Sequence, residues 1–322
     1  MEIRIGSLNC LNFGRESIGK KDIKIIAGII LREKLDIIAL QEVKSEEAVK
    51  IIVSELNSRS IYAWKWFCDK NDPRQEYAFV WNSNKLDYPK TKLPSGEIRI
   101  YYPHIYKQYG RDPQLGKLNL VRPPLYGRFQ TIFPGLPSIE LRLINTHIRY
   151  SKGKDGELLP ASAAEKDLRE SELKALTKHI YYHVSDKGYG AREGEGDPRT
   201  SYTILLGDYN LNLRESHAGS PYISEELVSI DLPSRKTDKG GKKIITVQSD
   251  LSTLKKMQET KSQQTEKFAN NYDHFTLDKN RFSGVSYTAE RVDTVEKYCD
   301  NDLQKHYEKV SDHVLIKMTL RL

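Results

Sequence analysis

Four short polar motifs each lie at an end of an apolar run that has the length and composition of a buried strand. The motifs are Leu40-Gln41-Glu42, Asn145-Thr146-His147, Gly207-Asp208-Tyr209-Asn210 and Ser311-Asp312-His313. Acids, amides and imidazoles at strand ends add little to packing, but side chains from several strand ends can converge on one pocket. These residue types suit a metal ion and a phosphate, so we interpret the chain as a metal-dependent phosphodiesterase.

Glu42 is the natural metal ligand because it is a carboxylate directly after an apolar strand. Magnesium binds through one or two carboxylates and keeps several water ligands. Asn9, at the end of the first strand, is expected to lie beside Glu42 as an amide ligand or a phosphate donor, and Asp312 is a further candidate ligand. The expected cofactor is magnesium, with manganese or calcium as alternatives.

A carboxylate paired with a histidine is expected to supply the general base. Such a carboxylate fixes the histidine tautomer and raises its basicity, and we assign the pair as Asp273 with His313. His147 is then expected across the phosphate as a proton donor or electrostatic stabiliser, with Glu76 orienting it.

Asp208 and Asn210 alternate at one strand end, so their side chains are expected to point to the same face. One of them is predicted to orient the attacking water and the other to donate to the phosphate.

Each motif also has a purely structural interpretation. Gln41-Glu42 is compatible with a turn into a helix that Ser45 caps, and Asn145-Thr146-His147 with a hydrogen-bonded strand end. We interpret four other histidines as surface or packing residues, namely His104, His179, His183 and His217. The combination of motifs, in this order, favours the catalytic interpretation.

The composition favours a polyanionic partner. The chain has 322 residues, with 51 Lys+Arg against 44 Asp+Glu, a formal charge of +7 and a pI of about 9.0. Ordinary surface lysines explain the charge equally well.

Cys10, Cys68 and Cys299 are widely spaced and indicate neither a disulfide framework nor a zinc site. With a strand-like start and no apolar run of bilayer length, we expect a soluble, cytoplasmic protein.

Apolar strand-like runs alternate with helical patterns along the whole chain, so we expect a single α/β domain over residues 1–322. Two less regular stretches, near residues 90–120 and 232–271, are interpreted as loop insertions. The predicted strands are Ile3–Leu8, Leu35–Leu40, Tyr77–Trp81, Ile139–Ile144, Tyr202–Leu206 and Val314–Leu320, and the predicted helices are Lys21–Lys34, Glu46–Asn57 and Ala161–Val184.

The order and wording of the motifs resemble the endonuclease/exonuclease/phosphatase superfamily, in its deoxyribonuclease I-like branch. The resemblance runs from Ser7-Leu8-Asn9 to Ser311-Asp312-His313. It implies a four-layer α/β/β/α sandwich, with two packed mixed sheets flanked by helices, and a magnesium-assisted hydrolase. Carried over by motif, the roles are those already given to Glu42, His147, Asp208, Asn210 and His313.

Further positions bear on the substrate. Arg122, followed by two prolines, resembles a phosphate-contacting arginine of deoxyribonuclease I, and Lys44 matches a position where that family places a basic residue toward the minor groove. Asn145 is a candidate substrate contact in the His147 motif. The family usually has its acid two residues before Tyr77, where this chain has Gln75, so Glu76 is expected on the opposite strand face.

We therefore expect a magnesium-dependent DNA endonuclease with little sequence specificity, RNA being a second candidate substrate. Loops rich in tyrosine could stack on bases or lie against the backbone; they contain Tyr101, Tyr102, Tyr106 and Tyr109. The alternative is a phosphatase or phospholipase of the same superfamily, which would use the same core residues. A binding protein with an inactive site is the third interpretation, and the complete set of polar groups argues against it. We expect neither a membrane nor an obligate protein partner.

Overall fold

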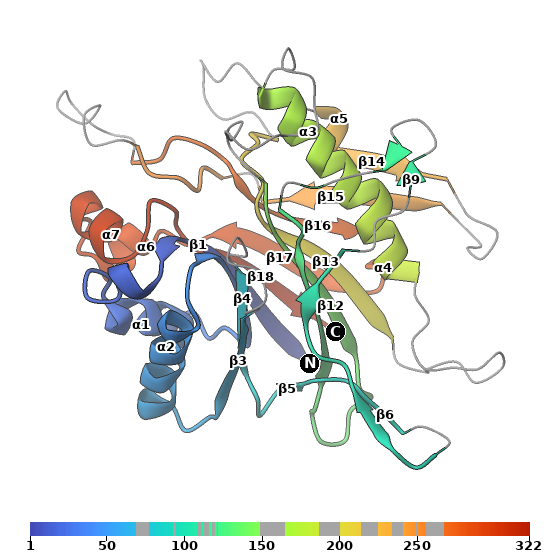
Figure 1. The fold of residues 1–322 in the computed structure, drawn as a ribbon, viewed down its shortest axis with the longest axis horizontal. Helices are drawn as coiled ribbons and strands as arrows, with labels where there is room; N and C mark the ends of the chain where they lie inside the picture. The colour runs from blue at the N-terminus through green and yellow to red at the C-terminus, as the bar shows by residue number, and fades with distance from the viewer. Residues whose placement is uncertain are drawn as a thin grey trace.

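The computed structural model describes residues 1–68, 77–92, 95–107, 111–112, 116–117, 120, 122–148, 165–186, 200–213, 225–233, 241–248, 250–255 and 267–322. Two mixed β-sheets pack face to face in the middle of the molecule (Figure 1). Helices cover the outer face of each sheet, which confirms the expected four-layer architecture.

The first sheet has six strands and places the two ends of the chain side by side. Strand β1 pairs in parallel with β2 and antiparallel with β18. In spatial order the strands are β17 (Ser286–Arg291), β18 (Ile316–Arg321), β1 (Glu2–Phe13), β2 (Ile37–Val43), β4 (Tyr77–Asn82) and β3 (Trp64–Cys68).

The second sheet is built around β12 and β13, which run parallel, while their outer neighbours pair antiparallel. In spatial order it contains β14 (Ser229–Leu232), β15 (Lys242–Val247), β16 (Asp273–Asp278), β13 (Ser201–Asp208), β12 (Glu140–His147), β11 (Leu125–Thr131) and β5 (Leu86–Asp87), with β8 (His104–Ile105) also on β11. Two small ribbons pair β6 (Lys90–Lys92) with β7 (Ile98–Ile100) and β9 (Arg111–Asp112) with β10 (Gly116–Lys117).

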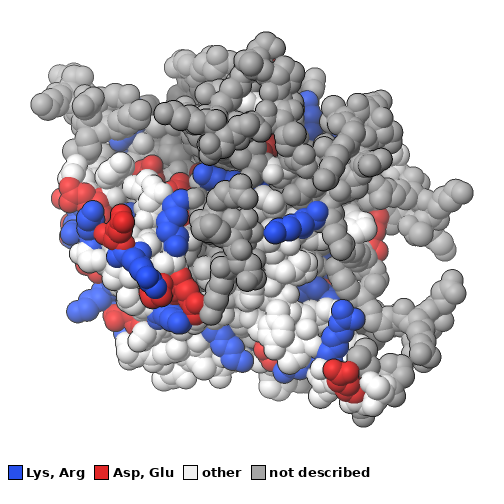
Figure 2. Space-filling view, viewed as in Figure 1, with Lys and Arg blue, Asp and Glu red and all other residues white. Residues whose placement is uncertain are grey.

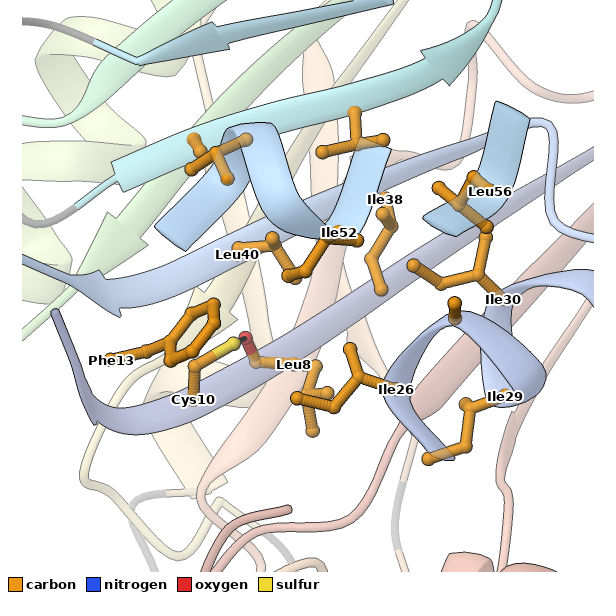
Figure 3. Packing of buried hydrophobic residues seen from close by; sticks show 14 of the residues in the cluster. Leu8, Cys10, Phe13, Ile26, Ile29, Ile30, Ile38, Leu40, Ile52 and Leu56 are labelled. Atoms are coloured by element: carbon orange, nitrogen blue, oxygen red, sulfur yellow. Dashed lines mark hydrogen bonds between the residues drawn. The ribbon is translucent and has the colours of Figure 1, made fainter. Parts of the chain in front are cut away.

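Helices α1 (Ile23–Arg32) and α2 (Glu46–Arg59) pack on the first sheet because each has one apolar face. Figure 3 shows isoleucines of both helices against Leu8 and Leu40 of the sheet. Both helices begin at a side-chain cap: Asp22 accepts from two backbone N–H groups of α1, and Ser45 accepts from one of α2. The same side of the molecule also carries η1 (Arg15–Ser17), α6 (Thr294–Tyr298) and α7 (Leu303–Lys309).

The second sheet is covered by one long helical segment, α3 (Glu165–Ala175), which continues through a π-helical turn, η2 (Leu176–Tyr181), into α4 (Tyr182–Asp186). Between the sheets lies an apolar core that contains an aromatic group, in which Phe129 packs against Phe79 and Trp81 at centroid distances of 5.4 and 5.3 Å. Helix α5 (Glu225–Val228) is short and adjoins β14 and β15. None of the described helices is long and apolar enough to span a membrane.

Every predicted strand and helix has a counterpart among the described residues, with ends shifted by a few positions. The first strand extends to Phe13 instead of Leu8, and residues 161–164 of the longest predicted helix lie outside the described part. The predicted insertions contain β6 to β10 and β15. Strands β3, β5, β11, β14, β16 and β17 were not predicted.

Candidate active site

The polar motifs meet at one edge of the sandwich because the strands that carry them are neighbours in register. Asn9 of β1 lies opposite Gln41 of β2, and Asp208 of β13 lies between His147 of β12 and Asp273 of β16. Residues from both sheets thus reach one buried cluster.

Asn9 joins the two carboxylates at the centre of this cluster. Its Nδ2 donates to Glu42 Oε1 at 3.1 Å and to Asp208 Oδ2 at 3.0 Å, while its Oδ1 accepts from the Leu11 backbone. The second Glu42 oxygen accepts from the Asn12 backbone N–H at 2.8 Å. The Asn9 amide nitrogen thus faces the two carboxylates, whereas the amide oxygen, the atom that could bind a metal ion, faces the Leu11 backbone. The role of metal ligand predicted for Asn9 remains a prediction.

His313 and Asp273 form the pair assigned from the sequence. The distance from His313 Nδ1 to Asp273 Oδ2 is 2.7 Å, and both side chains are almost fully buried. Burial lowers the pKa of His313, but the charges of Asp273 and Asp208 outweigh it and raise the pKa well above its ordinary value. The bond to Nδ1 leaves Nε2 directed toward Asp208, with 3.6 Å between Nε2 and Oδ2.

His147 lies on the other side of the same carboxylate. Its Nε2 is 3.6 Å from Asp208 Oδ2 and 3.9 Å from Glu42 Oε1. The guanidinium of Arg122 donates to the ring, with 2.6 Å between Nη1 and Nδ1. Burial, then Arg122, lowers the pKa of His147 well below its ordinary value, so this imidazole is neutral. The Tyr77 hydroxyl accepts from the His147 backbone N–H and fixes this strand end.

Asp208 is therefore surrounded by two imidazoles and an amide. Burial raises its pKa to about 7, with Asp273 adding to the rise and His313 opposing it. Oδ1 accepts from the Asn210 backbone at 2.8 Å, and the Asn210 amide donates to the Ile148 carbonyl at 2.7 Å. Asp208 and Asn210 thus lie in one turn at the end of β13, and the expectation that their side chains point to the same face remains a prediction.

Unusual backbone geometry shapes two of these turns. Glu42 has φ +56° and Asn210 has φ +49°, in the left-handed region that such residues adopt rarely. Gly207 has φ +139°, and a Cβ at this position would lie 1.9 Å from the Thr146 carbonyl oxygen. Only glycine therefore lets β13 approach β12 this closely beside His147 and Asp208.

Asn145 connects the two sheets behind the cluster. Its amide nitrogen donates to the Leu40 and Ala78 carbonyls, and its oxygen accepts from Gln41 Nε2 at 2.7 Å. Its side chain is fully buried, and the substrate contact predicted for it remains a prediction.

Ser311 links the last motif to the first. Its hydroxyl donates to the Asn9 carbonyl and accepts from the His313 backbone N–H at 3.1 Å. The Lys21 ammonium donates to the neighbouring Val310 carbonyl at 2.9 Å. Asp312 is half-buried and its Oδ1 accepts from the Ser311 hydroxyl at 3.3 Å, and its predicted role as a metal ligand remains a prediction.

Lys44 is exposed and lies close enough to Glu42 and Arg122 for their charges to act on it. Desolvation lowers its pKa, whereas Glu42 raises it and Arg122 adds to the lowering. Glu76, assigned to orient His147, lies outside the described residues, as does Gln75.

The donor set is compatible with magnesium, although within the described residues no group of three or more acidic, histidine or cysteine side chains is arranged to hold a metal ion. Magnesium needs only one or two carboxylates because water completes its shell. Glu42 and Asp208, which share the Asn9 amide, provide two hard oxygen donors.

Sequence reasoning missed the supporting roles of Tyr77, Ser311, Gln41 and Gly207. Gln41, Gly207 and Ser311 lie within the polar motifs, so their positions carried a signal although their contacts did not. The cross-strand contact of Tyr77 and the close approach at Gly207 depend on strand pairing, which the motifs do not specify.

No family model matches the sequence, and no curated protein matches it. Solved structures do match over the whole chain. The endonuclease/exonuclease/phosphatase from Bacteroides vulgatus is 12% identical, with a TM-score of 0.57, and the match covers 100% of this chain and 99% of that one.

Two further solved structures also match over nearly the whole length of both chains. The family protein from Leptotrichia buccalis C-1013-b is 12% identical with a TM-score of 0.51, covering 99% of this chain and 100% of that one. The D. rerio TDP2 humanized by 14 mutations is 12% identical with a TM-score of 0.51, covering 100% and 99%. The chain has an α/β/β/α sandwich fold. That fold is the one found in endonuclease/exonuclease/phosphatase family proteins, so the fold that the resemblance implies is confirmed.

Proposed function

We propose that the chain is a metal-dependent phosphoesterase that hydrolyses phosphodiester bonds, with DNA as its substrate. One observation carries the proposal: the His313–Asp273 pair and His147 lie on two sides of Asp208, whose Oδ2 is 3.6 Å from each Nε2. With His313 on one side of Asp208 and His147 on the other, one imidazole can activate a water that attacks phosphorus and the second can stabilise the oxygen that leaves.

The roles follow from the hydrogen bonds. Asp273 holds Nδ1 of His313, so Nε2 is the atom that takes a proton from water. His147 is neutral, and with Arg122 it faces the opposite side, where both can stabilise the oxygen that leaves. Asn9 keeps Glu42 and Asp208 in place. Asn210 is held by the Ile148 carbonyl and fixes the turn that presents Asp208.

Glu42 and Asp208 would hold the magnesium ion. When bound, the cation would neutralise a phosphate oxygen and offset the Asp208 charge that helps to keep His313 protonated.

DNA is supported by the two basic residues beside the site, Arg122 and Lys44, rather than by the surface as a whole. On the face drawn in Figure 2, Lys and Arg are interleaved with Asp and Glu over the side that carries α1 and α2. The endonuclease/exonuclease/phosphatase neighbours are consistent with phosphoester chemistry and leave the substrate open.

The deciding experiment incubates the purified chain with supercoiled plasmid, with and without magnesium, beside His313→Ala and a matched variant, His104→Ala, at an exposed histidine. We expect nicking that requires magnesium and His313 but not His104. A general base contributes roughly 10²-fold to 10⁴-fold to the rate, so the loss should be of that size.

Normal nicking by His313→Ala would contradict the base assignment. An intact plasmid, with the fold verified by circular dichroism, would reject DNA. The same variants would then be assayed on phosphorylated small molecules and phospholipids, which are the alternative substrates.

A further inference from the structure

His274 is a fully buried histidine one residue beyond the Asp273 carboxylate, and the mechanism does not use it. It lies on the opposite face of β16 from Asp273, since successive strand residues alternate. Both its ring nitrogens contact backbone carbonyl oxygens: Nδ1 is 3.1 Å from Gln248 O and Nε2 is 3.0 Å from Leu211 O.

Two carbonyl partners constrain the protonation state. A neutral imidazole has one N–H and one lone pair, so it can satisfy only one carbonyl and must direct its lone pair at the other. An imidazolium donates at both nitrogens. A ring turned by 180° would place carbon atoms at both positions and would remove both hydrogen bonds.

We infer that His274 is a buried imidazolium that holds the candidate active site together, acting as a positioning residue for the Asp208–Asn210 turn and for Asp273. Leu211 directly follows Asn210. Gln248, the other carbonyl partner, donates from its own side chain to the Asp273 carbonyl at 3.0 Å. One charged ring therefore ties the ends of β13 and β15 to the start of β16.

Several groups around His274 favour its charged form and so oppose the effect of burial on its pKa. Burial is the largest influence and leaves the pKa of His274 below its ordinary value, although the Leu211 and Gln248 carbonyls, the Asp273 charge and the Asn271 backbone raise it; the charge is therefore inferred from the two carbonyl partners of the ring. The Tyr209 ring packs beside it at a centroid distance of 5.2 Å, and the Tyr209 hydroxyl is directed to the Leu205 carbonyl. Among the described residues, Asp273 is thus the charged group whose charge acts on His274, through the backbone of β16 rather than from the same strand face.

The charge has a consequence for the base pair. Asp273 Oδ1 is buried without a hydrogen-bond partner in the described part of the chain. A neighbouring imidazolium places a positive charge close to this carboxylate, whose other oxygen, Oδ2, lies 2.7 Å from Nδ1 of His313.

The unmodified chain tests the charge directly, independently of the proposed function. In the ¹H–¹⁵N spectrum of histidine-labelled protein at pH 7, both His274 nitrogens should resonate as protonated, with signals assigned by replacing histidines one at a time. His306 is the internal reference. It is equally buried, but its Nε2 faces the Thr294 hydroxyl, which can donate, and burial lowers its pKa to about 4. It should show one protonated and one bare nitrogen. A bare nitrogen on His274 would overturn the inference.

The positioning role, which rests on the proposed function, is tested with His274→Gln and His274→Arg. The amide is neutral, whereas the guanidinium is a cation with several donors. We expect His274→Gln to lower kcat about 10-fold to 100-fold with little change in KM, and His274→Arg to restore part of the loss. Unchanged kcat in folded His274→Gln would overturn the role. If the wild type itself cleaves no phosphoester, the proposed function fails while the spectrum still decides the charge.

Discussion

At the scale of single residues, the Asp273 carboxylate sets both the tautomer and the charge of His313. Asp273→Asn should lower kcat by roughly 10²-fold to 10⁴-fold, because the amide no longer fixes the imidazole as a base. Asp273 raises the pKa of His313, so its removal lowers that pKa. The pH at which activity rises should therefore move to lower values in the variant, and a pH profile of kcat/KM measures this.

Ser252 provides a control for that variant, because its hydroxyl accepts from the Asp273 backbone N–H but does not contact the carboxylate. Ser252→Ala should leave the midpoint of the pH profile in place. A profile that is equally shifted in both variants would show that the effect is structural.

Asp208 links pH to stability in the metal-free protein. Burial raises its folded pKa to about 7, above an unfolded value of about 4. Its protonated form is therefore favoured by folding, and this stabilisation is complete below pH 4 and lost as pH rises toward 7. Compared with the wild type, Asp208→Asn should become relatively more stable over that range, by up to about 4 kcal/mol. Urea unfolding with chelator at pH 4, 5, 6 and 7 measures the difference, and a difference independent of pH would contradict it.

At the scale of elements, the close approach of β13 to β12 depends on Gly207. Gly207→Ala places a methyl group 1.9 Å from the Thr146 carbonyl oxygen and forces φ +139° on a residue with a side chain. We expect destabilisation of about 4 kcal/mol or more, measured by urea unfolding. Gly284→Ala is the matched control, because a Cβ there meets no atom within 4 Å. Equal stability of the two variants would show that the strands can separate at little cost.

The elements that the sequence predicts are those with a clear apolar period. The sequence did not predict β16, because four of its six residues, Asp-His-Phe-Thr-Leu-Asp, are polar and the strand has no apolar run, although all six are buried. Asp273, His274 and Thr276 are buried with hydrogen-bond partners inside the fold, and hydropathy does not reveal such partners.

The sequence predicted which residues form the candidate site better than it predicted how their side chains are oriented. Motif order is enough to pair Asp273 with His313 and to place Asp208 and Asn210 together. The orientation of the Asn9 amide and the contact of Arg122 with His147 depend on side-chain rotamers and on neighbouring strands. Local sequence carries no information on these.

At the scale of the whole molecule, the net charge of +7 is the small difference between 51 basic and 44 acidic residues, and on the face drawn in Figure 2 the two signs are interleaved. Because the described residues of that face form no large basic patch, DNA binding should depend on few phosphate contacts. In a His313→Ala background, log Kd should vary linearly with log salt concentration. Arg122→Ala and Lys44→Ala should each reduce the slope by about 1. Lys305→Ala, at an exposed lysine paired with Asp300, should not change it. Equal slopes in all variants would place the phosphate contacts elsewhere.

The pairing of β1 with β18 has a consequence for when the first sheet can form during synthesis. Ser311 and Asn9 are hydrogen-bonded although 302 positions separate them, and β18 lies between β1 and β17. A nascent chain still lacking this segment has a gap in its first sheet and no His313. The first sheet can therefore close only after β18 has been synthesised, and under the proposed function a chain that stops short of His313 also lacks the proposed base.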